Sequence, residues 1–204
     1  LYEAGGFGLL KTHYYGGIKK YQWTAVPLAL HGVVVKADGT SVDVCIGEDE
    51  DDPVFCVSDL LIHLSKDQLQ KTLAEGVTGE NLNIVFGSEP YRDEKIDEPI
   101  KLNLLKILNT KYGIKEEDFI SAELTAVPAD KARDIGLDRS LIGGYGHDDR
   151  CCAYPALTAL FDTDNSTETI MVILADKEEI GSEGVSGIQS QVFSDLLQEI
   201  AEAE

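Results

Sequence analysis

Two pairs of adjacent carboxylates have the residue types and the setting for metal-assisted hydrolysis. Asp148 and Asp149 follow a glycine-rich stretch at residues 143–146, and Glu178 and Glu179 follow an unbroken apolar run at residues 169–175. In such chemistry a cation lowers the pKa of a water molecule and a carboxylate takes the proton. One glutamate would bind the metal while its neighbour faces the water, and an aspartate would bridge two metals about 3.5–4 Å apart. Paired carboxylates also occur at helix N-termini and in solvated turns, so the residues alone leave both interpretations open.

Other common chemistries are not indicated. The sequence contains no GxxxxGK(S/T) phosphate loop, no GxSxG nucleophile turn and no CxxC pair. The acidic runs at residues 48–52 and 162–168 lack the glycine that an EF-hand calcium loop needs at its sixth position. Three of the four histidines lie in or beside apolar segments, which is more typical of structural histidines than of metal ligands. The four cysteines also lack zinc-binding spacing, and we expect them to be buried and reduced, as in a cytoplasmic protein.

Composition restricts the partners. A formal charge of −20, from 37 acidic and 17 basic residues, argues against nucleic acid, because phosphate binding needs clustered Lys and Arg. No apolar stretch approaches the ~20 residues of a membrane span, and the first residues lack a secretion-signal pattern. We expect a soluble, cytoplasmic protein. The sequence has no initiator Met and stops inside a predicted helix, so we also expect both ends to be truncated.

The first two thirds of the sequence predict many short elements. Residues 25–35 and 41–46 are rich in β-branched and apolar residues and flank a turn, which predicts a β-hairpin. Further short apolar segments lie at residues 53–57, 60–64 and 81–87. Residues 99–112 carry an apolar stripe at helical spacing and end at Gly113, and residues 118–127 alternate like a strand.

After residue 138 the pattern changes to one typical of an α/β domain. Residues 151–161 predict a helix that is apolar on every side and therefore buried, which tolerates Pro155 only if the helix begins shortly before it. Residues 169–175 predict a central parallel strand covered on both faces, and residues 188–200 predict an amphipathic helix. Sites in such sheets form beyond the carboxyl ends of the strands, where Glu178 and Glu179 lie. We place a domain boundary within residues 140–147.

Four motifs in this order resemble the aspartyl aminopeptidase family of dinuclear zinc peptidases. They are YGGIKKYQW with PLALHGVVV from Tyr15, VSDLLIHL from Val57, GLDRSLIGGYGHDDRCCAYPALTAL from Gly136, and DKEEIGSEGVSGIQS from Asp176. The resemblance implies a portion of a zinc-peptidase-like α/β catalytic domain with an inserted β-rich dimerisation domain. Residues 1–14 would end the preceding part of the catalytic domain, residues 15–145 would form the insertion, and residues 146–204 would resume the catalytic domain.

The resemblance also assigns roles to individual residues. Asp148 matches the carboxylate that bridges two Zn²⁺ ions, and Glu179 matches a terminal ligand of one of them; Co²⁺ or Mn²⁺ are further candidates. Glu178 matches the general base. Asp149 would orient the metal ligands without binding the metal itself, and Asp176 would help to orient the glutamate loop.

By this resemblance the complete protein would be a metalloaminopeptidase. It would remove N-terminal residues from peptides with a hydroxide bound to two zinc ions, in a homo-oligomer of dimers assembled into a tetrahedral dodecamer. The family's ligand set also requires a histidine before the first residue of this chain and an aspartate and a histidine after its last. We therefore expect the chain alone to bind zinc weakly and to be inactive.

One position departs from the family pattern, and another nearby retains it. Asp59 stands where better-known eukaryotic members bring a histidine from a neighbouring subunit into the active site, while His63 keeps the family's second histidine. A strict preference for acidic N-terminal residues is therefore not implied. Two alternatives remain open: a non-catalytic assembly fragment without a complete metal site, and an unrelated acidic protein whose paired carboxylates cap helices.

Overall fold

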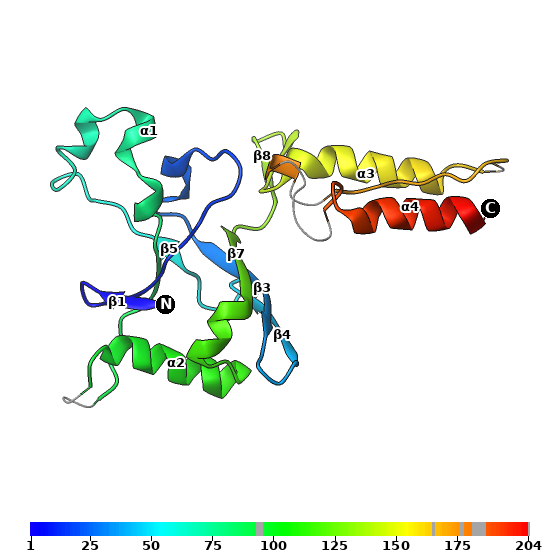
Figure 1. Cartoon of the computed structure of the whole chain (residues 1–204). Coiled ribbons are helices and arrows are strands. Elements are labelled where there is room, and N and C mark those ends of the chain that lie inside the picture. The colour runs from blue at the N-terminus through cyan, green and yellow to red at the C-terminus, as the bar shows by residue number, and fades with distance from the viewer. Residues whose placement is uncertain (93–95, 165, 176–177, 181–186, 204) are drawn as a thin grey trace. The chain divides into compact units, whose positions relative to one another are not determined.

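The fold was examined in a computed structural model, which describes residues 1–92, 96–164, 166–175, 178–180 and 187–203 (Figure 1). The chain forms two compact units. The first comprises Leu1–Tyr14 and Lys19–Lys131, and the second comprises Tyr15–Ile18 and Ala132–Glu204. The predicted limits at residues 14/15 and 145/146 describe domains of a whole enzyme and stay predictions.

The first unit contains a four-stranded sheet covered by a helix. The strands β1 (Tyr2–Ala4), β2 (Phe7–Leu10), β6 (Ile84–Gly87) and β5 (Cys56–Val57) pair antiparallel in the order β1-β2-β6-β5. Helix α2 (Pro99–Tyr112) lies against it, so closely that a Cβ at Gly8 would be 2.2 Å from the Leu104 side chain. Glycine in the strand is what permits this approach. The helix has the predicted bounds, and Gly113 ends it in the left-handed conformation, φ 68°.

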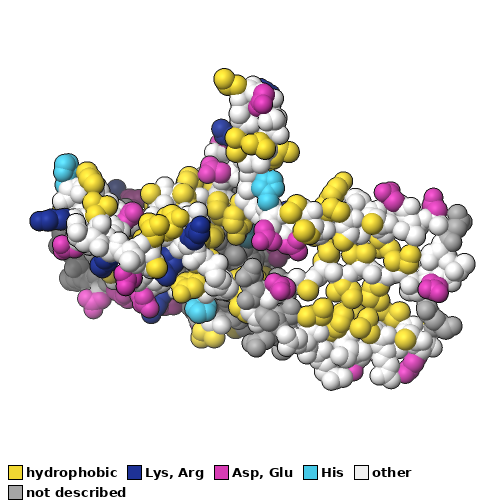
Figure 2. Space-filling view, turned by 90° about the horizontal axis from the view of Figure 1, so that it is seen from above, with side chains coloured by type: hydrophobic (Ala, Val, Ile, Leu, Met, Phe, Trp, Pro, Cys, Tyr) yellow, Lys and Arg dark blue, Asp and Glu magenta, His cyan; other side chains and the backbone are white. Residues whose placement is uncertain are grey.

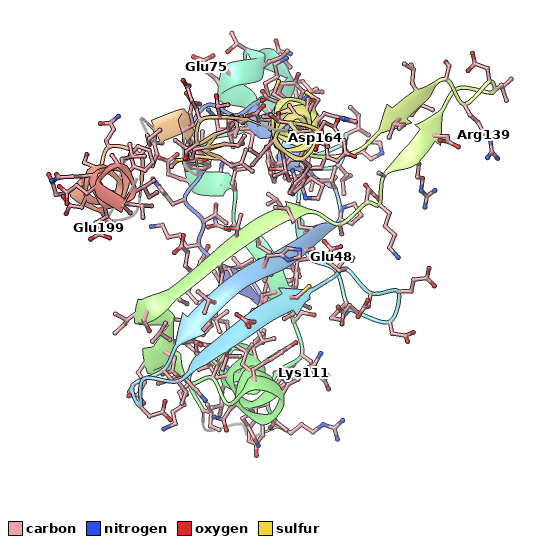
Figure 3. The ribbon with its side chains drawn as sticks, turned by 90° about the vertical axis from the view of Figure 1, so that its right-hand side faces the viewer. Glu48, Glu75, Lys111, Arg139, Asp164 and Glu199 are labelled. Carbon is pink, nitrogen blue, oxygen red and sulfur yellow. The ribbon has the colours of Figure 1, made fainter. Side chains whose placement is uncertain are left out.

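The same unit contains a three-stranded antiparallel sheet in the order β4-β3-β7 (Figure 3). Strands β3 (Leu28–Val35) and β4 (Ser41–Ile46) form the predicted hairpin, and Asp38 stabilises its turn by accepting a hydrogen bond from the backbone N–H of Thr40 (2.9 Å). The remaining helical segments are short: η1 (Lys20–Trp23), η2 (Gln68–Gln70), α1 (Leu73–Gly76), η3 (Gly79–Asn81) and η4 (Glu116–Ser121).

The strand predicted at residues 118–127 begins later than expected. Residues 116–121 form η4, and only Ala122–Pro128 form strand β7. The reason is a local helical turn, in which the buried Asp118 carboxylate accepts a hydrogen bond from the backbone N–H of Lys115 (2.8 Å). A carboxylate that caps its own turn offers the backbone an alternative to the ladder of a sheet.

The second unit contains a β-hairpin, β8 (Arg133–Ile135) with β9 (Leu141–Gly143), and the helices α3 (His147–Phe161), η5 (Glu178–Ile180) and α4 (Gln191–Ala203). Asp148 and Asp149 depart from helical geometry, so the regular part of α3 begins after them and Pro155 lies in its second turn. Helix α4 begins three residues later than predicted.

Three predictions of burial fail in this unit. Residues 169–175 form no strand. A parallel strand needs a partner strand, and among the described residues of the second unit only β8 and β9 pair, with each other. Helix α3 has no buried residue where burial on every side was expected. Figure 2 shows hydrophobic side chains exposed along this part of the chain. The cysteines are free, but they are not buried as predicted: Cys151 and Cys152 here and Cys45 in the first unit are exposed, and Cys56 is half-buried. Cys45 lies between the buried Val44 and Ile46, so it points to the opposite, exposed face of β4.

Candidate functional site

The Asp148–Asp149 pair lies in a turn at the start of α3. Gly146 precedes it in the left-handed conformation, φ 83°, which a residue with a Cβ adopts only at a cost. Asp148 (φ −87°, ψ 112°) is extended, and the peptide bond between the two aspartates is cis. The glycine-rich sequence before the pair thus has a direct structural use, since it lets the chain reverse from β9 into the helix.

The side chains beside Asp148 are held within this turn. The Nε2 atom of His147 lies 3.1 Å from the carbonyl oxygen of Ile142, and the Nη1 atom of Arg150 donates to the carbonyl oxygen of Gly146 (3.2 Å). The Asp149 carboxylate, with a smaller contribution from Cys151, raises the pKa of the Cys152 thiol. The turn is therefore fixed by its own side chains.

Asp148 itself is left available. Its side chain is exposed, and no described residue donates a hydrogen bond to its carboxylate. A carboxylate without a donor has all its lone pairs free for a cation, which is what a bridging metal ligand requires.

The predicted glutamates lie in a separate element of the same unit. Glu178 and Glu179 form the first two residues of η5, and Glu178 is exposed. The side chain of Glu179 and the whole of Asp176 lie outside the described residues. The proposed division of roles between the two glutamates therefore stays a prediction.

The described residues supply only part of a zinc site. Catalytic zinc takes about three protein ligands, and no group of three or more His, Cys, Asp or Glu side chains in the described part of the chain is close enough to hold a metal ion. The carboxylate of Asp148 suits zinc chemically, but the donors among the described residues are incomplete.

Asp59, in the first unit, has a structural use. Its carboxylate accepts hydrogen bonds from Gln68 Nε2 (2.9 Å), from its neighbour Leu60 N–H (2.8 Å) and from Thr24 Oγ1 (3.3 Å). The bond from Gln68 contributes most to lowering the pKa of this carboxyl, and burial opposes it. These bonds connect Asp59 with Thr24, 35 residues earlier, and with Gln68, nine residues later. His63, by contrast, has no hydrogen bond or ion pair with any described residue.

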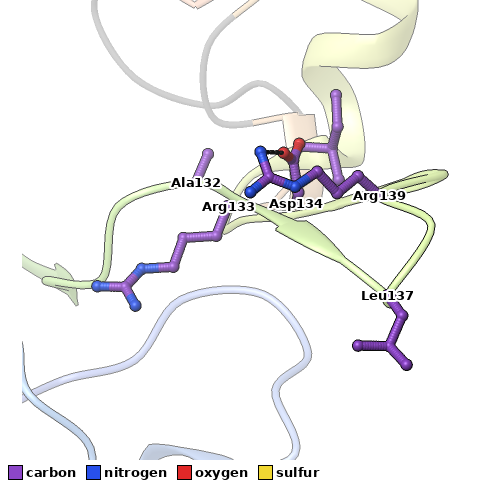
Figure 4. Close-up of a pocket in the computed structure, with 7 residues that line it drawn as sticks. Ala132, Arg133, Asp134, Leu137 and Arg139 are labelled. Atoms are coloured by element: carbon purple, nitrogen blue, oxygen red, sulfur yellow. Dashed lines mark hydrogen bonds and ion pairs between the residues drawn. The ribbon is translucent and has the colours of Figure 1, made fainter.

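A shallow cavity in the β8–β9 hairpin holds none of the predicted site residues (Figure 4). Arg133, Leu137 and Ile142 contribute to its lining, and Arg139 is paired with Asp134 at 3.5 Å. Arg133 and Arg139 point in different directions, so the cavity does not converge on a ligand.

Sequence reasoning gave no role to His147 or Arg150. Their positions carried a signal, since both flank the acidic pair and Arg150 lies four residues after Gly146, the spacing at which side chains reach back over one helical turn. The signal was weak because the reach of each side chain depends on the non-helical backbone of Asp148 and Asp149.

Comparisons with known proteins identify the family of this chain. The model of the family "Aminopeptidase I zinc metalloprotease (M18)" matches residues 2–204. A probable M18 family aminopeptidase 1 of Clostridium acetobutylicum is 54% identical over 200 residues, which are 98% of this chain and 43% of that protein. This chain therefore belongs to the M18 family of zinc metalloproteases.

Solved structures of the family have the same fold. An M18 aminopeptidase of Thermotoga maritima matches with a TM-score of 0.92 and 48% identity, over 99% of this chain and 44% of that one. Aminopeptidase I of C. acetobutylicum matches with a TM-score of 0.88 and 52% identity, over 100% of this chain and 44% of that one. The mixed α/β fold class is confirmed. The chain spans less than half the length of these relatives.

No helix in the described part of the chain has the length and apolar character that crossing a membrane requires.

Proposed function

We propose that the complete protein is a zinc-dependent aminopeptidase that removes N-terminal residues from peptides. The observation that carries the proposal is the exposed carboxylate of Asp148, to which no described residue donates a hydrogen bond, in a chain that belongs to the M18 family. Asp148 and Glu179 would hold the metal ions. Asp149 and Asp176 would support them. Zinc, when bound, lowers the pKa of a water molecule and polarises a carbonyl group.

Glu178 is the proposed general base. Its carboxylate takes a proton from the water that attacks the first peptide carbonyl, and returns that proton to the departing amine as the C–N bond breaks. The products are a free amino acid and a peptide shortened by one residue. An exposed glutamate at the start of a short helical segment has the freedom to meet a substrate.

The test is chelator-sensitive hydrolysis of a panel of amino-acid p-nitroanilides by the complete protein, beside the 204-residue chain. We expect release by the complete protein only, and its loss on chelation. Glu178→Gln should lower kcat by about 10²-fold or more while bound zinc is retained. Glu199→Gln, an exposed glutamate in α4, is the matched control and should leave kcat unchanged. No release by the complete protein with any substrate or metal would refute the proposal.

A second candidate function applies to the chain by itself. The absence of a three-ligand group in its described residues favours a non-catalytic assembly fragment, whose residues 15–145 would mediate dimerisation and, in the complete enzyme, a dodecamer. Elemental analysis separates the two cases. A purified 204-residue chain that retains zinc in stoichiometric amounts after dialysis would contradict the fragment reading.

A further inference from the structure

A group of large apolar side chains is exposed on the first unit, although that unit has a hydrophobic core of its own. Each member is between 53% and 72% exposed, and all of them lie within residues 60–73. They are Leu60, Leu61, Ile62, Leu64, Leu69 and Leu73. Single apolar residues are normal on a protein surface, whereas a cluster of them marks an interaction site. These residues form the Leu60–Leu73 surface.

Hydrogen bonds hold the backbone of this surface in place. Ser65 is buried, and its Oγ donates to the carbonyl oxygen of Ile62 (3.1 Å). The Nε2 atom of Gln68 donates to the carboxylate of Asp59 (2.9 Å) and to the carbonyl oxygen of Gly76 (3.2 Å). A segment that is already fixed loses little conformational entropy when a partner docks on it.

The charge of the surface points to a second copy of the chain as the partner. The chain carries −20, so two copies repel each other over most of their surfaces. Residues 60–73 instead contain two lysines, Lys66 and Lys71, and one aspartate, Asp67, which gives a formal charge of +1. All three side chains are exposed, and none forms an ion pair with another described residue. An acidic second copy is therefore not repelled here, and its carboxylates can pair with the lysines.

We propose that two copies of the chain associate through the Leu60–Leu73 surface about a two-fold axis. In such a contact both copies present the same patch, so aliphatic side chains pack in the centre and charges of both signs meet at the rim. The proposal names the surface for the dimerisation proposed above for residues 15–145 and rests on that part of the proposed function. It does not depend on a metal site.

The experiment measures the mass of the complete protein in solution, by sedimentation over a range of concentrations. Leu61→Lys places a charge within the surface of both copies, and we expect the Kd of self-association to rise about 10²-fold or more. Ile107→Lys is the matched control, because Ile107 is also an exposed aliphatic residue (51%) of the first unit. It lies in α2, which Figure 1 shows at the opposite end of that unit from α1, and it should associate like the wild type. Unchanged association of Leu61→Lys would overturn the proposal.

Lys66→Glu tests the surface without removing an apolar contact. It replaces attraction to an acidic second copy by repulsion, so the Kd should rise about tenfold at low salt and less at high salt. If Leu61→Lys does not fold, judged by circular dichroism, Lys66→Glu decides alone, and an unchanged Kd contradicts the proposal. A wild type that stays monomeric would refute this surface even if it hydrolyses peptides. A wild type that associates but releases no p-nitroaniline would refute only the proposed aminopeptidase.

Discussion

The two units of the chain differ in whether their apolar side chains are buried. Every buried hydrophobic side chain that was found lies in the first unit, between Leu28 and Ile114. The described residues of the second unit include no buried side chain, although its helices and the segment between them are rich in large apolar residues such as Phe161 (74% exposed) and Ile173 (46% exposed). The first unit contains its own hydrophobic core. The second unit has apolar side chains that could form a core, but no described layer covers them.

We infer from this difference that the second unit needs further layers, which its described residues do not supply. A helix or strand that is apolar on all sides is stable only when both of its faces are covered. The chain spans less than half of its relatives, and the proposed metal site lies in the uncovered unit. We infer that the first unit stabilises itself, while the second unit and its carboxylates acquire their final environment from the remainder of the polypeptide.

The sharpest test of the first unit's independence is Gly32→Ala. Gly32 lies within β3 between its two partner strands, with φ 151°, and a Cβ there would be 1.9 Å from the carbonyl oxygen of Glu123. The strands would have to separate, so we expect a loss of about 3 kcal/mol or more in the free energy of unfolding. Urea denaturation of the chain, followed by circular dichroism, measures it.

Gly17→Ala is the control, since nothing lies within 4 Å of the added Cβ. It should change the free energy of unfolding by less than about 0.5 kcal/mol. Equal effects of the two substitutions would mean that the three-stranded sheet is not the stable part of the chain.

A pair of leucines compares the two units directly. Leu104 of α2 is buried against the four-stranded sheet, whereas Leu157 of α3 is 36% exposed. Leu104→Ala should lower the free energy of unfolding by about 2–4 kcal/mol, because it leaves a cavity. Leu157→Ala should cost the chain less than about 1 kcal/mol. The same denaturation experiment, made on the chain and on the complete protein, gives both values.

The comparison becomes decisive in the complete protein. If other layers cover α3 there, the cost of Leu157→Ala rises towards that of Leu104→Ala. A cost that stays small in the complete protein would contradict the inference that the second unit is covered.

Local patterns in the sequence were sufficient where an element depends mainly on itself. Helix α2 has the predicted bounds because its apolar stripe and the left-handed Gly113 are both encoded within the segment, and the β3–β4 hairpin formed because its turn residues lie between two apolar runs. The strand at residues 169–175 was wrong because a strand also needs partners, which a run of apolar residues does not identify. The start of β7 was wrong because Asp118 caps a helical turn, a contact that alternation alone does not predict.

The roles proposed for the candidate site stay predictions, but part of its local structure could be inferred from the sequence. The paired carboxylates and the glycines before Asp148 could be read from residue types and spacing. The hydrogen bond from Arg150 to the Gly146 carbonyl oxygen could not, because it depends on the non-helical backbone of the two aspartates. The environment of Glu179 and Asp176 remains a prediction from the resemblance.

The smallest expected effect concerns Asp59, whose bonds join distant segments of the first unit. Its pKa is lowered, chiefly by the hydrogen bond from Gln68. A carboxyl whose folded pKa lies below its unfolded value, about 3.9, stabilises the protein above that value and loses this contribution as the pH falls through the folded pKa. Because Asp59 is exposed, solvent screening limits the contribution to less than about 1 kcal/mol.

Asp59→Asn should therefore lower the urea midpoint at about pH 7, and the difference from the wild type should shrink as the pH approaches about 2. Asp195→Asn serves as the control, since Gln191 of the same exposed helix is the partner of that carboxylate (2.8 Å) and no distant segment depends on it. We expect a smaller effect from it at pH 7. Two results would contradict this prediction: equal effects of Asp59→Asn and Asp195→Asn on the urea midpoint, or an Asp59→Asn effect that persists in acid. Either would mean that the charge of Asp59 does not stabilise the first unit. The difference between the two units would then rest on apolar packing alone.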